Sequence, residues 1–328
     1  MRALLCTELG SIDALAVHDL PSPRPGPGEV VVDVKASALN YPDALMVRGL
    51  YQVKPPLPFA PGMEVAGVVK EAGEGVTTLR AGDRVTGFPG HGGFAEEVAM
   101  PADRLVRLPD ALPFDLGAAF GLTYGTSLHA LQECAQLQAG ESLLVLGAAG
   151  GVGLAAVELG KVMGARVIAA ASTDEKLAAC RRAGADEVVN YATEDLRQRL
   201  KEIGGARGID VVYDPVGGAL SETALRATAW GGRLLVVGFA AGEIPKIPLN
   251  LALLRERRIV GVYWGDWTQH DPAGQARNGD LLVRWIAEGR IRPLISERVP
   301  LGGVPAALAR MTNREVVGKV VVLPEQSG

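Results

Sequence analysis

The chain has 328 residues, a length that favours two domains over one. A net charge of −4 with interspersed signs excludes the basic surface that nucleic acid or an anionic membrane would require, so we expect neither as a partner. We find no uncharged apolar run of about 18 residues and no secretion signal at the N-terminus. Three scattered cysteines, Cys6, Cys134 and Cys180, indicate a reducing, cytoplasmic compartment.

The first 120 residues or so are rich in glycine and proline and have short β-like runs. We predict strands at Gly28–Ala36, Met63–Lys70 and Asp83–Thr86. The segment Pro21–Gly28 has too few amide donors for a central strand and reads as a connector. This part of the chain is therefore predicted to be a mostly β domain.

From Thr123 the sequence pattern changes, and a helix is predicted over Thr123–Gln136. Strand-like and helix-like segments then alternate, which predicts an α/β fold with a doubly wound parallel sheet, the Rossmann arrangement. The predicted strands are Ser142–Leu146, Arg166–Ala171, Glu187–Val189, Ile209–Tyr213, Arg233–Val237 and Arg258–Tyr263. The predicted helices are Val152–Met163, Asp174–Ala183, Glu194–Ile203, Ala219–Ala229 and Leu249–Arg255.

A glycine-rich turn between the first of these strands and the next helix predicts a dinucleotide site. Backbone N–H groups at such a helix start bind a pyrophosphate. The predicted contacts are Ala149, Gly150, Gly151, Val152 and Gly153. Ala148 replaces the first glycine of the usual Gly-x-Gly-x-x-Gly pattern, so a turn whose glycines serve only packing stays an alternative.

After Gly265 we predict helices at Gly279–Ala287 and Val304–Met311 and a strand at Lys319–Leu323. This tail is too short for a domain of its own. We expect it to complete the first domain, giving one domain of residues 1–122 plus 266–328 and an inserted domain of residues 123–265.

The end of the second predicted strand indicates which cofactor binds. NAD-selective folds place Asp or Glu there for the ribose 2′-hydroxyl, whereas this chain has Ala171 followed by Ser172, Thr173 and Lys176. Two hydroxyls and an ammonium suit a 2′-phosphate, so NADPH is the expected cofactor. We interpret Asp174 as a cap or first-turn acid of the next helix.

The whole chain resembles the zinc-independent branch of the medium-chain dehydrogenase/reductase superfamily, and most closely the zeta-crystallin type of NADPH:quinone oxidoreductase. The matching segments are Pro27–Val30, Asn40–Asp43, Pro61–Gly67, Gly82–Val85, Gly92–Glu96, the glycine turn, Gly231–Arg233 and Gly318–Lys319. The resemblance implies a Rossmann domain inserted in a mostly β GroES-like catalytic domain. It also implies a homodimer formed through the last strand of the nucleotide sheet.

The positions of the metal ligands in zinc-dependent relatives look like Asn40 and Met63 here, and the four-cysteine zinc lobe is missing. His91 and Glu64 form at most a weak pair, so we expect no metal. Without a Lewis acid, the plausible chemistry is hydride delivery to an acceptor that is already electrophilic.

The resemblance also implies roles for single residues. It places Asn40 near the nicotinamide ribose and the substrate, and it implies that Asp43 holds the loop of Asn40. The alternative is that both residues only form a turn. Tyr41 is a further catalytic candidate, because the tyrosine expected two residues after Asp43 is Leu45. Further cofactor contacts are expected from Thr126 (or a helix cap), Tyr191, Gly238, Phe239 and Lys319. Trp264 either lines a pocket for the acceptor or only packs within the domain or dimer interface.

The leading functional hypothesis is NADPH-dependent reduction of a quinone, a small-molecule acceptor. The alternatives are reduction of an activated C=C bond in an enone, 2-alkenal or enoyl thioester, and nucleotide binding with little catalysis. No residue stands out as a general acid, so the final proton is expected from water.

Overall fold

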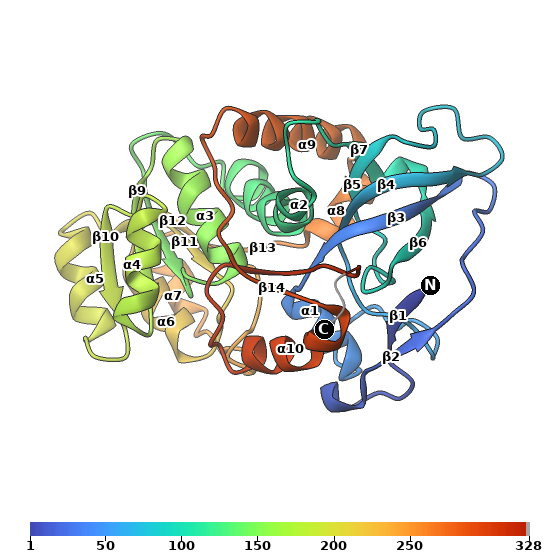
Figure 1. Cartoon of the computed structure of the whole chain (residues 1–328). Coiled ribbons are helices and arrows are strands. Elements are labelled where there is room, and N and C mark those ends of the chain that lie inside the picture. The colour runs from blue at the N-terminus through green and yellow to red at the C-terminus, as the bar shows by residue number, and fades with distance from the viewer. Residues whose placement is uncertain (326–328) are drawn as a thin grey trace. The chain divides into compact units, whose positions relative to one another are not determined.

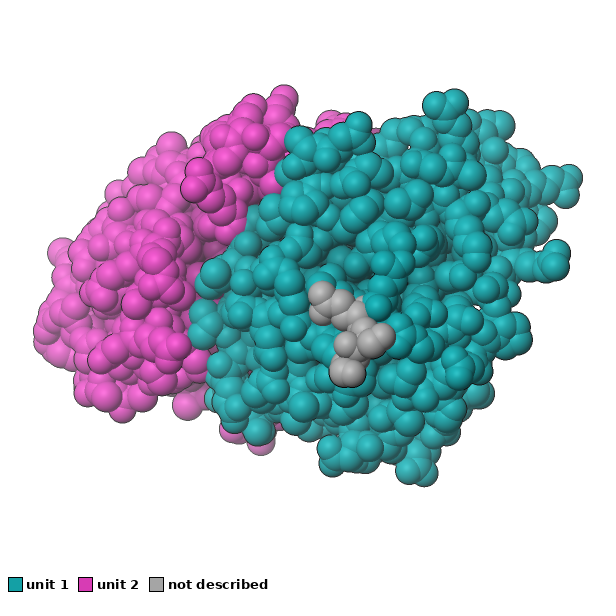
Figure 2. All heavy atoms as spheres, in the orientation of Figure 1, with its two compact units in different colours: residues 1–122, 293–328 teal, residues 123–292 magenta. Residues whose placement is uncertain are grey.

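The computed structural model describes residues 1–325. Internal contacts divide the chain into two compact units (Figure 2). The first unit contains Met1–Leu122 and the chain from Pro293 onward, and the second contains Thr123–Arg292. Within the described range, no helix has the length and apolar character needed to cross a membrane.

The second unit is built on a six-stranded parallel sheet in the order β10-β9-β8-β11-β12-β13. Figure 1 labels most of these strands and the helices that connect them. Its strands are β8 (Ser142–Leu146), β9 (Arg166–Ala171), β10 (Glu187–Asn190), β11 (Ile209–Asp214), β12 (Thr228–Val236) and β13 (Arg258–Gly261). The order and the uniform direction confirm the predicted Rossmann sheet.

Helices connect these strands, so the sheet is doubly wound. They are α3 (Gly151–Val162), α4 (Asp174–Arg182), α5 (Leu196–Gly204), α6 (Ala219–Arg226) and α7 (Asn250–Leu253). Helices α3 and α4 pack on β8, β9 and β10, while α6 packs on β11 and β12. The core between sheet and helices contains apolar side chains such as Leu144, Ile168 and Leu225. The strand order reverses between β8 and β11, and ligands of such folds bind at this reversal, beyond the carboxyl ends of the strands.

The first unit is mostly β, as predicted. Its main sheet has the order β14-β15-β3-β4-β5-β7, with β6 also paired to β3, and β1 and β2 form a separate hairpin. The strands are β1 (Arg2–Leu5), β2 (Ala16–Asp19), β3 (Glu29–Ala38), β4 (Val65–Ala72), β5 (Arg84–Gly87), β6 (Glu97–Pro101), β7 (Leu105–Arg107), β14 (Ile295–Val299) and β15 (Lys319–Val322). Helices α1 (Tyr41–Val47) and α10 (Val304–Thr312) pack on each other.

Several elements of the first unit were not predicted: β1, β2, β6, β7, β14 and α1. They are short, and β2 is exposed at every residue, so no alternation of apolar and polar side chains marks it. Three of them, β6, β7 and β14, depend on pairing with strands elsewhere in the chain, such as β6 with β3.

The tail returns to the first unit later than residue 266. Helices α8 (Trp264–His270) and α9 (Pro272–Ala287) belong to the second unit. Asn278 of α9 donates to Glu133 at 3.1 Å, and the Arg292 N–H donates to Glu158 at 3.0 Å. These contacts hold residues 266–292 in the second unit, and the chain from Pro293 onward completes the first.

Helix α2 (Phe114–His129) begins nine residues before the predicted Thr123 and ends in a π-helical turn at Ala130–Cys134. Three glycines at four-residue spacing hide it, because glycine disfavours helices. Each one admits a close neighbour: a Cβ on Gly117 would lie 2.8 Å from Leu108, on Gly121 2.4 Å from Phe88, and on Gly125 2.7 Å from Trp264. Packing therefore requires the glycines that weaken the sequence signal.

Replacing Gly125 by alanine tests this conclusion. Alanine improves helix propensity by about 1 kcal/mol, yet its Cβ would overlap the Trp264 ring, and overpacking costs about 1–3 kcal/mol. We expect Gly125→Ala to lower the free energy of unfolding, measured by urea titration. The matched control is Gly279→Ala in α9, where a Cβ meets nothing within 4 Å and should stabilise the protein. A stabilising Gly125→Ala variant would contradict the packing argument.

Candidate functional site

The glycine turn joins β8 to α3 at the strand-order reversal. The residue of the turn with positive φ is Gly147, at 56°, so the alanine at position 148 avoids the left-handed region. A Cβ on Gly153 would lie 2.5 Å from the Gly147 carbonyl oxygen, which explains the glycine there. Gly150 is the N-cap of α3, and its missing side chain leaves the helix start open. The turn therefore keeps the geometry of a pyrophosphate site although its first glycine is absent.

Polar side chains gather where β9 and β10 end. Asn190 pairs with Ala171 in the sheet register, and the Tyr191 N–H donates to the Ala171 carbonyl at 3.1 Å, so Tyr191 lies beside the end of β9. The Lys176 ammonium donates to Ser172 Oγ at 3.2 Å. This pair, Ser172 and Lys176, brings a hydroxyl and a cation together at the edge where cofactors bind.

Asp174 and Thr173 both help to start α4. Thr173 is the N-cap, and its hydroxyl accepts the Lys176 N–H at 3.3 Å. Asp174 is a first-turn acid, where the helix dipole favours negative charge. Its carboxylate also accepts the side-chain amide of Asn190 at 2.8 Å.

Gly238 and Phe239 follow β12 at the same edge of the sheet. Phe239 is partly exposed and lies against Gly217, where a Cβ would come within 2.9 Å of the ring. Thr126 lies near the end of α2, so the alternative that it caps a helix start is wrong.

Trp264 is buried and packs inside the second unit. Its ring covers Gly125, and its indole N–H donates to Gln275 Oε1 at 3.0 Å. Trp267, in the next turn of α8, stacks on His129 with 4.3 Å between ring centroids. These contacts favour the packing interpretation of the tryptophans over an acceptor wall.

In the first unit, a buried polar cluster joins three elements. Lys319, the first residue of β15, donates from its ammonium to Asn40 Oδ1 at 2.7 Å, to Glu64 Oε1 at 2.6 Å and to the Leu39 carbonyl at 3.0 Å. The Asn40 amide donates to Glu64 Oε1 at 2.8 Å and to the Ala38 carbonyl at 3.2 Å. All three residues are at least 95% buried, and every ammonium hydrogen has an acceptor. Lys319 therefore acts within this cluster rather than as a free cation.

Asp43 holds the loop that carries Asn40. Its carboxylate accepts the Asn40 N–H at 2.8 Å and the Gly62 N–H at 3.0 Å. Burial raises the pKa of Asp43 to about 7, and the two N–H donors only partly offset that rise. Tyr41 is half-buried at the first residue of α1, directly after Asn40. The four residues Asn40, Asp43, Glu64 and Lys319 thus form one cluster, and Asp43 reaches it through the backbone of Asn40.

Glu64 is the residue whose role sequence reasoning missed. It follows Met63, and the sequence indicates at most a weak pair with His91. The structure instead places its carboxylate on Asn40 and Lys319, and its second oxygen accepts the Leu122 N–H at 2.9 Å. His91 lies at the surface with its ring edge-on to Phe59, and partial desolvation of the ring lowers its pKa. The signal available was Glu64 inside an apolar run, since such an acid needs a buried partner.

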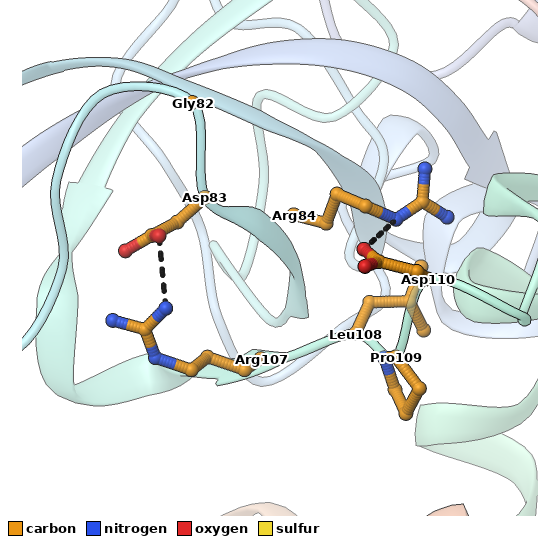
Figure 3. Close-up of a pocket in the computed structure, with 7 residues that line it drawn as sticks. All are labelled: Gly82, Asp83, Arg84, Arg107, Leu108, Pro109 and Asp110. Atoms are coloured by element: carbon orange, nitrogen blue, oxygen red, sulfur yellow. Dashed lines mark ion pairs between the residues drawn. The ribbon is translucent and has the colours of Figure 1, made fainter.

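A hollow of about 350 Å³ lies at the β5–β7 edge of the first unit (Figure 3). Two ion pairs line the hollow, Arg107 with Asp83 at 2.8 Å and Arg84 with Asp110 at 3.7 Å. The positive and negative charges of its lining therefore balance. Arg84 also lies 3.9 Å over the Phe114 ring. The hollow contains none of the predicted site residues.

Comparisons with known proteins agree with this geometry. Residues 26–110 match the alcohol dehydrogenase GroES-like domain, and residues 151–276 match the zinc-binding dehydrogenase family. Quinone oxidoreductase-like protein 2 of Bos taurus is 40% identical over 98% of this chain and 92% of its own length. The chain belongs to the medium-chain dehydrogenase/reductase superfamily.

Within this superfamily the chain groups with quinone oxidoreductases and quinone oxidoreductase-like proteins. The quinone oxidoreductase of Lama guanicoe is 34% identical over 98% of this chain and 97% of its own length. The Escherichia coli quinone oxidoreductase, solved in complex with NADPH, superposes with a TM-score of 0.93 at 29% identity, over 99% of this chain and 100% of that one. The chain is thus an oxidoreductase of the superfamily.

The superfamily's zinc chemistry prompts a test of whether zinc fits. Met63 packs against the apolar core of the first unit, and Asn40 Oδ1 lies 2.7 Å from the Lys319 ammonium. An amide and a thioether are not zinc ligands of the usual kind, and the ammonium would repel a second cation. Across residues 1–325, no three His, Cys, Asp or Glu side chains are arranged to hold a metal. The residues present do not fit a zinc ion.

The ion pair between Glu64 and Lys319 should control the stability of this oxidoreductase. Lys319→Met leaves the buried Glu64 carboxylate without its cation, which costs about 3–5 kcal/mol of unfolding free energy. We expect the double variant Lys319→Met with Glu64→Gln to recover part of that loss, because the unpaired charge is gone. Urea titration of both variants measures the difference. Equal losses in the single and the double variant would show that burial of the charge is not the cause.

Proposed function

We propose that this chain is an NADPH-dependent reductase that transfers a hydride to quinones without a metal ion. The observation that carries the cofactor assignment is the polar edge after β9. No carboxylate stands at Ala171, and Ser172 and Lys176 lie together beside Tyr191. A hydroxyl and an ammonium bind a 2′-phosphate, whereas an acid at the strand end would bind the 2′-hydroxyl of NADH.

In this proposal the glycine turn, Ala149, Gly150, Gly151, Val152 and Gly153, holds the pyrophosphate through backbone N–H groups at the start of α3. Gly150 contributes through its missing side chain, because its own N–H donates to the Gly147 carbonyl at 3.1 Å. When bound, the nicotinamide supplies the hydride. Thr126, Gly238 and Phe239 line the nicotinamide part of the cofactor. The protein contributes orientation and excludes water, and the final proton comes from solvent.

Asn40 is proposed to position the nicotinamide ribose and the acceptor. Both of its amide hydrogens are committed to Glu64 and Ala38, and Lys319 fixes its oxygen, so the side chain keeps one orientation. Tyr41 is proposed to contact the acceptor, since it directly follows Asn40 at the start of α1. A carbonyl already activated by conjugation needs no Lewis acid. The Lys319 ammonium beside Asn40 would repel a metal cation, so the site agrees with such an acceptor.

The acceptor is tested by following the oxidation of NADPH, through the absorbance of its reduced nicotinamide, with simple quinones, 2-alkenals, enones and enoyl thioesters. We expect turnover with quinones, a preference for NADPH over NADH, and unchanged rates after dialysis against EDTA.

Lys176→Ala should raise the NADPH Michaelis constant about tenfold with little change for NADH.

Other outcomes would revise the proposal. Rapid turnover of an alkene without turnover of any quinone would make the chain a C=C reductase. Tight NADPH binding without reduction of any acceptor would favour a nucleotide-binding role. Loss of activity on EDTA treatment would contradict the metal-free assignment.

We further propose a homodimer formed along β13, in a cytoplasmic protein whose three cysteines are unpaired. Strand β13 is the edge of the six-stranded sheet, and its Ile259 is 41% exposed. Leu253 and Leu254, in the segment before β13, are also exposed. Unpaired strand edges with apolar side chains favour pairing with a second chain.

Light scattering tests the dimer. We expect the wild type at twice the mass of one chain, and Ile259→Lys at the mass of one chain, because an edge lysine opposes strand pairing. Leu9→Lys is the control, since Leu9 is equally exposed but lies outside this sheet. A wild-type mass of one chain would refute the dimer.

A further inference from the structure

Asp174 is an acid in an unexpected place. It lies two residues after Ser172 and two before Lys176, where the proposed function puts the 2′-phosphate of NADPH. A phosphate with a charge near −2 is repelled by a carboxylate close to it. The helix dipole at the first turn of α4 favours the carboxylate but does not direct it away from the ligand.

Asn190 supplies that direction. It ends β10 and is 6% exposed, and its amide nitrogen donates to Asp174 Oδ1 at 2.8 Å. Its amide oxygen accepts the Ala192 N–H at 3.2 Å. Because the oxygen faces a donor, the nitrogen must face Asp174, and the amide cannot turn over without losing both bonds.

The backbone fixes Asn190 as well. Its N–H donates to Glu194 Oε1 at 2.7 Å, and the Tyr191 N–H donates to the Ala171 carbonyl. The amide of Asn190 is thus a rigid donor at the end of β10, and it fixes one oxygen of Asp174 there.

We propose that Asn190 is a positioning residue for cofactor specificity and acts through Asp174. By holding the carboxylate against the end of β10, it lets the Ser172–Lys176 pair accept a 2′-phosphate although an acid stands between them in sequence. The inference rests on the proposed NADPH specificity, and it adds a residue that does not itself touch the cofactor.

The test measures binding of two fragments to the full chain by calorimetry: adenosine 2′,5′-bisphosphate, which carries the 2′-phosphate, and 5′-AMP, which does not. The variants are Asn190→Ala, Asp174→Asn and their combination. We expect Asn190→Ala to weaken bisphosphate binding by roughly three- to tenfold, the range for a mobile carboxylate in a solvated site. Binding of 5′-AMP should change less than twofold.

The double variant separates positioning from a general structural effect. If Asn190 acts through Asp174, Asn190→Ala has no further effect once Asp174→Asn has removed the charge. The matched control is Glu175→Gln, which removes an equal charge from the same helical turn. Asn190→Ala should weaken bisphosphate binding as much in this background as in the wild type.

Asn190→Asp is a near-isosteric second variant in case Asn190→Ala does not fold, as judged by thermal unfolding. It places a carboxylate against Asp174 and should weaken bisphosphate binding further, with 5′-AMP again little affected. An unchanged ratio of the two affinities in both Asn190 variants, or an equal loss with and without Asp174→Asn, would overturn the inference. If the wild type binds both fragments equally, the NADPH assignment fails as well, which distinguishes the two failures.

Discussion

A buried ion pair between Glu64 and Lys319 joins the two chain segments that make up the first unit. The two residues are 255 positions apart in sequence, yet their charged atoms lie 2.6 Å apart. Charges buried this deeply are tolerated only when they are paired and hydrogen-bonded. Lys319 opens β15, which pairs with β3, and Asn40 follows β3, so the pair forms only when the last strand has joined the sheet. The orientation of Asn40 therefore depends on a residue near the end of the chain.

In the second unit, polar groups stand at one edge of a sheet whose interior is apolar. The strand β9 is entirely apolar near its carboxyl end, and polar residues begin directly beyond it at Ser172. There the polar groups occur in fixed contacts: Lys176 with Ser172, and Asn190 with Asp174. Contacts of this kind set the direction of each charge before a ligand arrives, which lowers the cost of ordering the site on binding.

The parallel sheet was predictable because each of its strands is a local apolar run. The predicted bounds of β8 and β9 match the observed ones, and both strands are buried on two faces. The predicted start of helix α2 is nine residues too late because Gly117 and Gly121 weaken the helix signal. These glycines leave room for Leu108 and Phe88, which lie elsewhere in the sequence. Local propensity carries no information about such neighbours.

The sequence by itself determined the Rossmann sheet and the position of the glycine turn, because each depends on residues close together in the chain. It determined the superfamily because short local segments spread along the whole chain match it. It also determined that Ala171 replaces the acid at the end of β9. Only the tertiary structure decided what the polar side chains do. Glu64 became the partner of Lys319, Trp264 a packing residue over Gly125, and Asn190 the donor to Asp174. The physical reason is that a buried or oriented polar group is defined by its partner, and these partners are brought together by strand pairing and helix packing rather than by sequence spacing.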